Sequence, residues 1–261
     1  MRYCGLEEGF ERVRTGYLVL MKPSRLVLFD IDGTILGTSR TIWPDPMKEV
    51  MEQVFVDMGD PRTIDTSQYR QGGKTDPQIF YDILMLNGIS EEKVTSFMPK
   101  LQKDYLQALR DKVTERPDYI ILKPGVEAVI QRLHEHPEVL MGLLTGNFEE
   151  GARLKLQPHN LNQYFPFGAF GDGTRQRSDL PQRGLDAAAK YAGHRFSSKE
   201  IVIIGDTPND IHCGRHLNVR VLAVATSHYS LDVLKAENPD YVFRDLTDTD
   251  KVIDAVLEHL G

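Results

Sequence analysis

The sequence predicts an α/β fold, in which a Rossmann-like parallel sheet has helices on both faces and a small all-helical domain is added to it. Short apolar runs of strand length recur along the chain, at residues 25–29, 139–144, 201–204 and 219–224. Helical apolar spacings separate these runs, and the long stretch after the first run shows only helical patterns. Strands that alternate with helices are typical of a parallel sheet covered on both faces.

The first apolar run, from Arg25 to Phe29, is continuous rather than alternating, and it stops at Asp30. A run of this kind predicts a strand that is buried on both faces, as the strands of parallel sheets are. The three later runs have the same character. The helices expected around them repeat apolar residues at helical spacing, as in Val126, Val129, Ile130 and Leu133, and in Val252, Ile253, Val256 and Leu257.

Residues from about 43 to 115 interrupt this alternation. They contain no strand pattern but three helical stretches, at residues 44–58, 76–87 and 90–113. Turn dipeptides separate these stretches, namely Asp60-Pro61, Gly72-Gly73 and Asn87-Gly88. A helical block inserted directly after the first strand predicts a cap placed over an active site. The expected division is therefore an N-terminal extension at residues 1–20, an α/β core at residues 21–40 and 118–261, and a helical cap at residues 41–117.

The composition of the chain limits its class of function. Of its 261 residues, 41% are hydrophobic and 26% are charged, which is ordinary for a globular protein. The net charge is −7, so the basic surface that nucleic acid requires is not expected. No apolar run is long enough to cross a bilayer, and Cys4 and Cys213 are too few for a disulfide framework. We expect a cytoplasmic monomer or homodimer with no nucleic-acid or membrane partner.

Acidic residues follow the first and the third of the predicted strands, and a hydroxyl residue follows the second. Asp30 and Asp32 come after the first strand, Thr145 after the second, and Asp206 and Asp210 after the third. Ligands of open parallel sheets bind beyond the carboxyl ends of the strands. Four carboxylates at one sheet edge would repel one another unless a cation lies among them, and hard oxygen ligands suit Mg²⁺. The sequence therefore predicts a metal-assisted site for an anion.

These blocks, with their order and spacing, resemble those of the haloacid dehalogenase superfamily. The matching segments read Asp30-Ile31-Asp32-Gly33-Thr34, Thr145-Gly146-Asn147 and Gly205-Asp206-Thr207-Pro208-Asn209-Asp210. The resemblance covers roughly residues 24–261, and it is to the phosphatase branch with a helical insert cap, of the phosphoglycolate phosphatase type. Because Asp32 is present two residues after the nucleophile position, the resemblance does not extend to the true dehalogenases.

The resemblance implies a role for each of these residues. Asp30 would be the nucleophile that becomes an aspartyl phosphate, and Asp32 would be the general acid and base. Thr145 would hold a phosphoryl oxygen. Mg²⁺ would be bound by Asp30, by the backbone carbonyl of Asp32 and by Asp206, with Asp210 supporting this shell. The substrate contacts implied in the core are Gly33, Thr34, Gly146 and Asn147.

The third block of the superfamily usually supplies a lysine that contacts the phosphate and the nucleophile. The corresponding segment here, residues 172–181, contains no lysine. Arg177 is the expected substitute, since a guanidinium can bridge phosphate and carboxylate. Arg175 and Lys155 are the alternatives for this role.

The turn at residues 71–76 lies between two predicted cap helices and resembles the substrate-reading loop of the family. Gly73, Lys74 and Thr75 are the expected substrate contacts, with Lys74 facing a carboxylate or phosphate. Alternatively, Thr75 or Asp76 simply caps the helix that begins near Pro77.

The expected function is that of a Mg²⁺-dependent phosphomonoesterase for a small phosphorylated metabolite, acting through an aspartyl phosphate on Asp30. One alternative is a phosphomutase of the β-phosphoglucomutase type, which would retain the phosphate. Another is a non-catalytic family member that acts as a binding protein. The intact set of Asp30, Asp32, Thr145 and Asp206 argues against this last alternative.

Overall fold

The computed structural model describes residues 22–39, 45–66, 69 and 72–258. The N-terminal extension expected at residues 1–20 therefore lies outside the described residues. The strands are β1 (Arg25–Phe29), β2 (Leu36–Thr38), β3 (Ile120–Leu122), β4 (Val139–Leu144), β5 (Gly168–Ala169), β6 (Ile201–Gly205), β7 (Arg220–Val224) and β8 (Tyr241–Phe243). The α-helices are α1 (Pro46–Asp57), α2 (Asp76–Leu86), α3 (Glu91–Glu115), α4 (Val126–Glu135), α5 (Glu149–Leu156), α6 (Leu180–Ala192), α7 (Pro208–Leu217), α8 (Leu231–Ala236) and α9 (Thr249–Leu257).

Short 3₁₀ helices complete the described elements: η1 (Pro117–Tyr119), η2 (Gln157–His159), η3 (Leu161–Tyr164), η4 (Arg177–Asp179) and η5 (Ser198–Glu200). Among the helices that the structure describes, none combines the length and the apolar composition needed to cross a bilayer.

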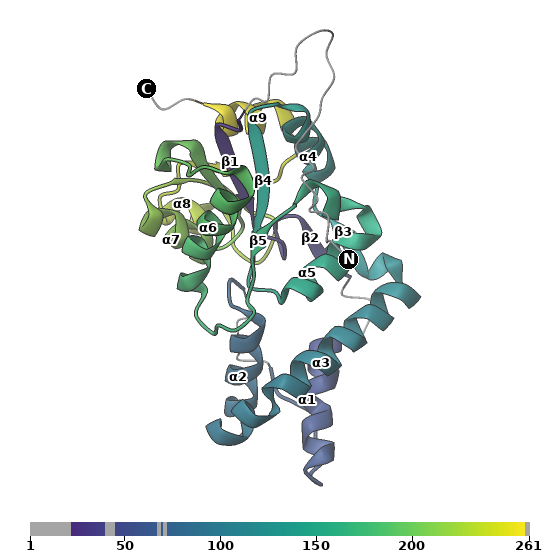
Figure 1. The fold of residues 1–261 in the computed structure, drawn as a ribbon. Helices are drawn as coiled ribbons and strands as arrows, with labels where there is room; N and C mark the ends of the chain where they lie inside the picture. Colours follow the sequence, from purple (N-terminus) through teal and green to yellow (C-terminus); the bar gives the residue numbers. More distant parts are fainter. Residues whose placement is uncertain (1–21, 40–44, 67–68, 70–71, 259–261) are drawn as a thin grey trace, which may run out of the picture.

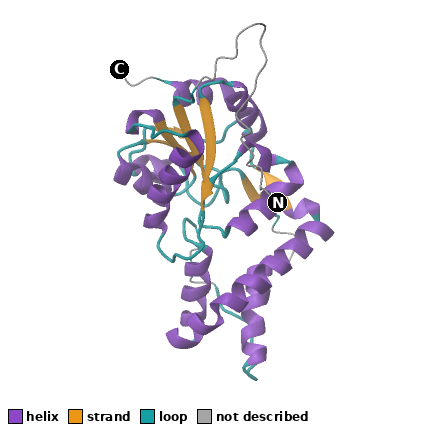
Figure 2. Ribbon diagram, in the orientation of Figure 1, coloured by secondary structure: helices purple, strands orange, loops and turns teal. Residues whose placement is uncertain are grey.

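The main sheet has six parallel strands in the order β5-β4-β1-β6-β7-β8 (Figures 1 and 2). The predicted α/β fold is confirmed, and the four predicted strands are β1, β4, β6 and β7. The strands β5 and β8 were not predicted, because β5 has two residues and β8 is only half-buried. Because β1 lies between β4 and β6, the residue that follows β1 occupies the middle of the sheet edge.

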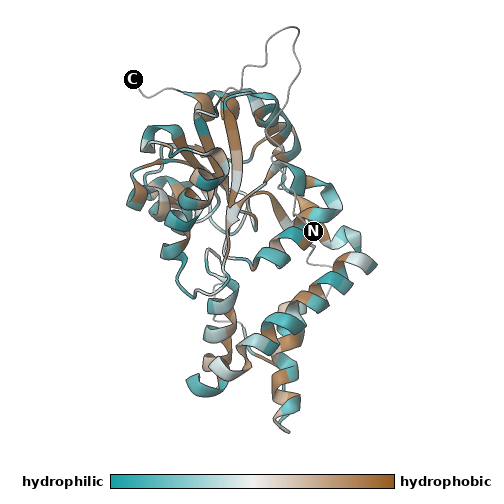
Figure 3. Cartoon of the chain, viewed as in Figure 1, coloured by the Kyte–Doolittle hydropathy of each residue, from teal (hydrophilic) through white to brown (hydrophobic). Residues whose placement is uncertain are grey.

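Alternate side chains of β1 build the core on the two sides of the sheet. Val27 and Phe29 belong to an apolar cluster that includes residues of α4 and α9. Leu26 and Leu28 belong to a second cluster that includes residues of α6 and α7. All five residues of β1 are buried, as expected for a strand covered by helices on both faces. Figure 3 shows the strands as the most apolar part of the ribbon.

The helices α1, α2 and α3, which we call the cap helices, occupy the segment predicted to be helical. Asp45 and Thr75 are the N-caps of α1 and α2, and each is followed by a proline in the first turn. The three helices lie together at one end of the sheet, beyond the arrowheads of β1 and β4 (Figure 1). The antiparallel pair of β2 and β3 lies where the chain leaves the core for these helices and returns from them.

Candidate active site

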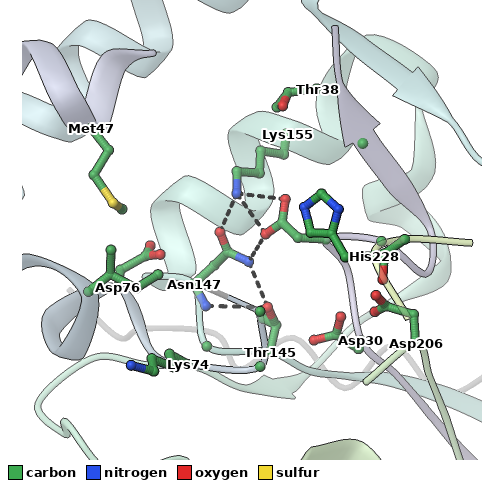
Figure 4. A pocket seen from close by; sticks show the side chains of 18 of the residues that line it. Asp30, Thr38, Met47, Lys74, Asp76, Thr145, Asn147, Lys155, Asp206 and His228 are labelled. Carbon is green, nitrogen blue, oxygen red and sulfur yellow. Dashed lines mark hydrogen bonds and ion pairs between the residues drawn. The ribbon is translucent and has the colours of Figure 1, made fainter. Parts of the chain in front are cut away.

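The strand ends predicted to converge do so around one cavity. Asp30 follows β1, Thr145 follows β4, and Asp206 follows β6. Since these strands are neighbours in the sheet, their carboxyl ends meet. All three residues line a cavity of about 810 Å³ between the core and the cap helices. Figure 4 shows their side chains around this cavity.

Arg177 lies between two buried carboxylates. Its Nη2 donates to Asp30 Oδ1 at 3.0 Å and to Asp210 Oδ1 at 2.5 Å. The pKa of Asp30 is raised well above its usual range by burial and by Asp210, and Arg177 opposes this shift. Burial alone would lower the pKa of Arg177, but Asp210 and Asp30 raise it overall. Arg177 is therefore a permanent positive charge beside the expected nucleophile.

The two alternatives to Arg177 lie elsewhere. Lys155 is buried, but it pairs with Asp32 rather than with Asp30. Arg175 is largely exposed, 4.0 Å from Glu91 and 3.9 Å above the ring of Tyr81. Of these three basic residues, the structure therefore brings Arg177 to Asp30.

Asp210 holds Arg177 in position and is itself held by the first turn of α7. Its Oδ2 accepts hydrogen bonds from Thr207 N at 3.1 Å and from Thr207 Oγ1 at 2.7 Å, which closes a capping box at the start of α7. Its Oδ1 accepts from Arg177. A Cβ at Gly205 would lie 2.3 Å from the carboxyl carbon of Asp210, so this position requires glycine. With both oxygens engaged, Asp210 fixes Arg177 in place.

The carboxylates of Asp30, Asp206 and Asp210 form an acidic cluster at the candidate metal site. One oxygen of each lies within 4.8 Å of the others. Burial and Asp210 raise the pKa of Asp206 to about 7. When ionised, the three carboxylates carry three negative charges, and Arg177 supplies one positive charge. The set is therefore short of positive charge, and a divalent cation with oxygen ligands fits it.

Thr34 and Gly33 place Asp206 in this cluster. Thr34 Oγ1 donates to Asp206 Oδ1 at 3.0 Å, and the threonine is fully buried. Gly33 has a φ of +100°, and a Cβ there would lie 2.2 Å from Asp206 Oδ2. Gly33 lines the cavity, whereas Thr34 does not. The expected substrate contact of Thr34 is thus replaced by a contact that holds Asp206.

Asp32 occupies a different electrostatic environment from Asp30. Lys155 Nζ donates to both of its carboxylate oxygens, at 2.9 and 2.8 Å, and Asn147 Nδ2 donates to Oδ2 at 2.6 Å. Figure 4 labels Lys155 and Asn147 and marks these hydrogen bonds with dashed lines. The Asp32 side chain is still 44% exposed and lines the cavity. One acid is therefore buried beside Arg177, and the other faces the cavity from an ion pair.

Thr145 keeps its hydroxyl proton available. Its Oγ1 accepts from Asn147 Nδ2 at 2.7 Å and from Asn147 N at 3.3 Å. Because both contacts use oxygen lone pairs, the O–H of Thr145 is left to donate into the cavity. Asn147 thus links Thr145 to Asp32, and Gly146 also lines the wall.

The turn before α2 packs directly on the loops of the core site. Asp76 N donates to the carbonyl of Gly146 at 2.8 Å, and Asn209 Nδ2 donates to the carbonyl of Gly73 at 2.8 Å. A Cβ at Gly146 would lie 2.0 Å from the carbonyl oxygen of Lys74. The cap helices are therefore docked on the loop that follows β4.

Some residues of this turn line the cavity, and others stabilise the start of α2. Gly73 and Lys74 line the cavity, and Lys74 Nζ pairs with Asp82 at 3.0 Å. Thr75 is fully buried; its hydroxyl donates to the carbonyl of Thr174 and accepts from Gln78 N. Thr75 therefore caps α2, as one alternative predicted, and does not reach the cavity. Gln71, at the start of the predicted turn, lies outside the described residues.

Several cavity residues were not identified from the sequence. The segment 226–229 follows β7, and the same strand-end rule would have found it. Tyr105 and Tyr119 gave no signal, because an aromatic residue in an amphipathic helix or an apolar segment is indistinguishable from a core residue. Tyr69 lies in a polar segment that matches no motif.

Asp76 connects the docked turn to the core, and it gives the first testable prediction. Its Oδ2 accepts from Phe148 N at 2.9 Å, and burial raises its pKa to about 7. The folded protein then retains a proton that the unfolded chain releases, so raising the pH from about 4 to about 7 costs stability. Asp76→Asn removes this cost, and its advantage over the wild type is expected to grow by about 2–4 kcal/mol between pH 4.5 and pH 8.

Urea denaturation of both proteins at the two pH values measures this difference. The control is Asp111→Asn on the exposed face of α3, for which no such change is expected. An Asp76→Asn variant whose stability follows the wild type at both pH values would contradict the prediction.

Comparisons with known proteins agree with this geometry. The sequence profile of a family described as haloacid dehalogenase-like hydrolases matches residues 27–224. A protein of Caldanaerobacter subterraneus provisionally named pyrophosphatase PpaX is 28% identical over 229 residues, which cover 87% of this chain and 93% of the relative. A phosphoglycolate phosphatase of Pseudomonas putida is 24% identical over 244 residues, which cover 91% of this chain and 81% of the relative.

Solved structures show the same fold. The crystal structure of a predicted phosphoglycolate phosphatase from Haemophilus somnus has a TM-score of 0.63 and 17% identity, with 89% of this chain and 99% of that chain covered. At this identity the likeness concerns the fold alone.

Proposed function

The chain belongs to the haloacid dehalogenase-like hydrolase family, and we propose that it is a magnesium-dependent phosphomonoesterase that acts on a small phosphorylated metabolite through an aspartyl phosphate on Asp30. The observation that carries the proposal is the separation of its two acids. Asp30 is buried against Arg177, while Asp32 faces the cavity from its pair with Lys155. The relatives named as phosphatase and pyrophosphatase support hydrolysis of a phosphoric ester or anhydride.

The two acids divide the reaction into two displacements. In the first, an oxygen of ionised Asp30 attacks phosphorus, the bond to the leaving oxygen breaks, and the protonated form of Asp32 gives that oxygen its proton. In the second, Asp32 takes a proton from water, the water oxygen attacks phosphorus, and the bond to Asp30 breaks. The products are an alcohol and inorganic phosphate; Asp30 is again a carboxylate, and Asp32 is again the protonated acid.

The surrounding residues position the phosphoryl group. The hydroxyl of Thr145 donates to one phosphoryl oxygen, since its lone pairs are occupied by Asn147. Arg177 lies beside Asp30 and offsets negative charge on the transferring group. Asp30, the backbone carbonyl of Asp32 and Asp206 would hold Mg²⁺. When bound, the ion would supply positive charge that offsets the negative charge of the phosphoryl group.

We propose that the cap, residues 41–117, closes over this site. The turn that includes Gly73 and Lys74 already lies on the loop after β4, so the cap helices and the core share one cavity wall. Closure of this kind excludes bulk water from the aspartyl phosphate until the leaving group departs.

Removal of magnesium tests the proposal directly. Phosphate release from a panel of small phosphoesters is expected to fall by a factor on the order of 100 or more in EDTA and to return when Mg²⁺ is added. Thermal unfolding supplies a second readout, because a ligand that binds the folded state raises the melting temperature with its concentration. Asp206→Asn is expected to lose this stabilisation by Mg²⁺.

The alternatives give different products. A phosphomutase would move phosphate between positions of a sugar and release little of it, whereas a binding protein would do neither. Turnover that is unaffected by EDTA, in protein freed of metal, would contradict the proposed metal dependence.

A further inference from the structure

The cavity is larger than the transferring phosphoryl group requires, and its far part is built by the cap helices. A pocket of about 810 Å³ lies within the range that holds drug-sized ligands. The part nearest β1 contains the acids described above. We call the remainder the cap-side lobe, and its walls are Asp45, Met47, Ile79, Tyr105, Leu109 and Tyr119.

Tyr105, on α3, brings an unpaired hydroxyl to this lobe. The residue is only 4% exposed, and its ring packs against Phe80 and Phe148 at centroid distances of 5.7 and 6.3 Å. It nevertheless lines the cavity, and within the described part of the chain its hydroxyl has no hydrogen-bond partner. Because this hydroxyl faces the cavity and can both donate and accept a hydrogen bond, it is available to pair with a bound molecule.

Negative charge surrounds this hydroxyl. Burial raises the pKa of Tyr105, and Asp76, Asp32 and Asp45 raise it further. All three carboxylates line the same cavity. The hydroxyl therefore stays protonated, and beside the carboxylate of Asp45 an uncharged group is favoured over a second anionic one.

Two of the positive charges of the cavity wall, on Lys74 and Lys155, are paired with carboxylates. Of the described cap residues that line the cavity, Lys74 is the cationic one; it pairs with Asp82 and lies 4.1 Å above the ring of Tyr69. On the core side, Lys155 pairs with Asp32. Lys123 donates to the carbonyl of Thr226 at 2.7 Å.

The remaining walls of the lobe suit an uncharged molecule with hydroxyl groups. Met47, Ile79 and Leu109 offer apolar contact. The hydroxyls of Tyr105 and Tyr119 and the carboxylate of Asp45 offer polar contacts. Tyr119 shares a hydrogen bond with Thr38, which also lines the cavity.

We propose that the cap-side lobe binds an uncharged, hydroxyl-bearing leaving group, with the Tyr105 hydroxyl as its specificity-determining contact. The preferred substrates are then phosphate monoesters of sugars or polyols, rather than phosphoglycolate or pyrophosphate, the substrates that the names of the relatives indicate. This inference rests on the proposed phosphomonoesterase function, and it adds the chemical class of the leaving alcohol.

The test compares kcat/KM across leaving groups. The panel contains sugar phosphates, polyol phosphates, 2-phosphoglycolate, pyrophosphate and p-nitrophenyl phosphate, the last serving as a measure of the chemistry alone. The best sugar or polyol phosphate is expected to exceed phosphoglycolate and pyrophosphate at least tenfold. Equal or faster turnover of either anionic substrate would overturn the inference.

Tyr105→Phe then tests the contact itself. Removal of one hydrogen-bonding hydroxyl is expected to lower the ratio of kcat/KM for the best hydroxylated substrate to that for p-nitrophenyl phosphate by about tenfold. The matched control is Tyr81→Phe, a tyrosine of α2 whose ring packs under Arg175 away from the cavity; it should leave this ratio unchanged. An unchanged ratio in Tyr105→Phe would assign Tyr105 a structural role and overturn the inference.

The outcomes distinguish failure of the leaving-group preference from failure of the proposed phosphomonoesterase function. Turnover of p-nitrophenyl phosphate without preference for hydroxylated esters would contradict only the inferred leaving-group preference. No phosphate release from any ester, in folded protein with Mg²⁺, removes both.

Discussion

Asp30→Asn is expected to abolish magnesium-dependent phosphate release, with a loss of roughly 10⁴-fold or more in kcat/KM. The amide that replaces the carboxylate is a poor nucleophile and cannot form the acyl phosphate. Thr145, Asn147 and Arg177 remain, but they act on a group that is no longer transferred. The loss should therefore be similar for every ester, including p-nitrophenyl phosphate, whose leaving group needs no proton.

Stability should not account for this loss. Burial and Asp210 raise the pKa of Asp30 well above its usual range, so its ionisation costs stability in the absence of metal, and Asp30→Asn removes that cost. Thermal unfolding without metal should show Asp30→Asn to be at least as stable as the wild type. Asp232→Asn, on the exposed first turn of α8, is the matched control for both measurements. A variant at position 30 that retains a tenth of the activity would rule out the nucleophile assignment.

The central part of the fold could be predicted because its strands are continuous apolar runs. β1, β6 and β7 are buried along their length and β4 at all but its first residue, and a strand buried on both faces needs no alternation. The pair of β2 and β3 could not be predicted in this way. Each has three residues of mixed burial, and their pairing depends on where the cap helices leave and rejoin the core.

The residues of the candidate site could be predicted where their place in the chain alone determines their place in the fold. A residue that ends a central parallel strand must lie at the sheet edge, and this places Asp30, Thr145 and Asp206. Side-chain direction in the following loops is not determined in this way. Thr34 and Thr75 point into the protein, where buried partners take up their hydroxyls.

Contacts between side chains far apart in the chain could not be predicted either, because they also depend on side-chain direction. Lys155 is 123 residues from Asp32 in the chain, and its reach to that carboxylate depends on the rotation of α5. Tyr105 lies in the apolar stripe of α3, where its hydroxyl cannot be told from an ordinary core position. Arg175 and Arg177 differ only in which of them the 3₁₀ helix η4 turns inward.

Arg177 gives the second large effect, and its two substitutions are expected to differ. In Arg177→Met, Asp30 and Asp210 lose their shared positive partner while both remain buried. Breaking a buried pair by removal of one partner costs about 3–5 kcal/mol, and we expect a loss of this size in urea denaturation. Activity should fall by a factor on the order of 100 or more, since the charge beside the transferring group is lost.

Arg177→Lys should retain most of both properties. The two contacts with carboxylates come from a single nitrogen, Nη2, which donates to Asp30 and to Asp210. A lysine ammonium can donate to two acceptors from one position, so the bidentate geometry of arginine is not what this site uses. Arginine also leaves its Nε buried and without a partner, a cost that lysine does not carry.

Activity within about tenfold of the wild type is therefore expected for Arg177→Lys, with stability between those of the wild type and Arg177→Met. The measurement is kcat/KM for p-nitrophenyl phosphate with saturating Mg²⁺, alongside urea denaturation of all three proteins. Equal activity in the methionine and lysine variants would mean that positive charge at this position does not assist the reaction. Equal stability of all three would mean that Asp30 and Asp210 do not depend on Arg177 for their burial.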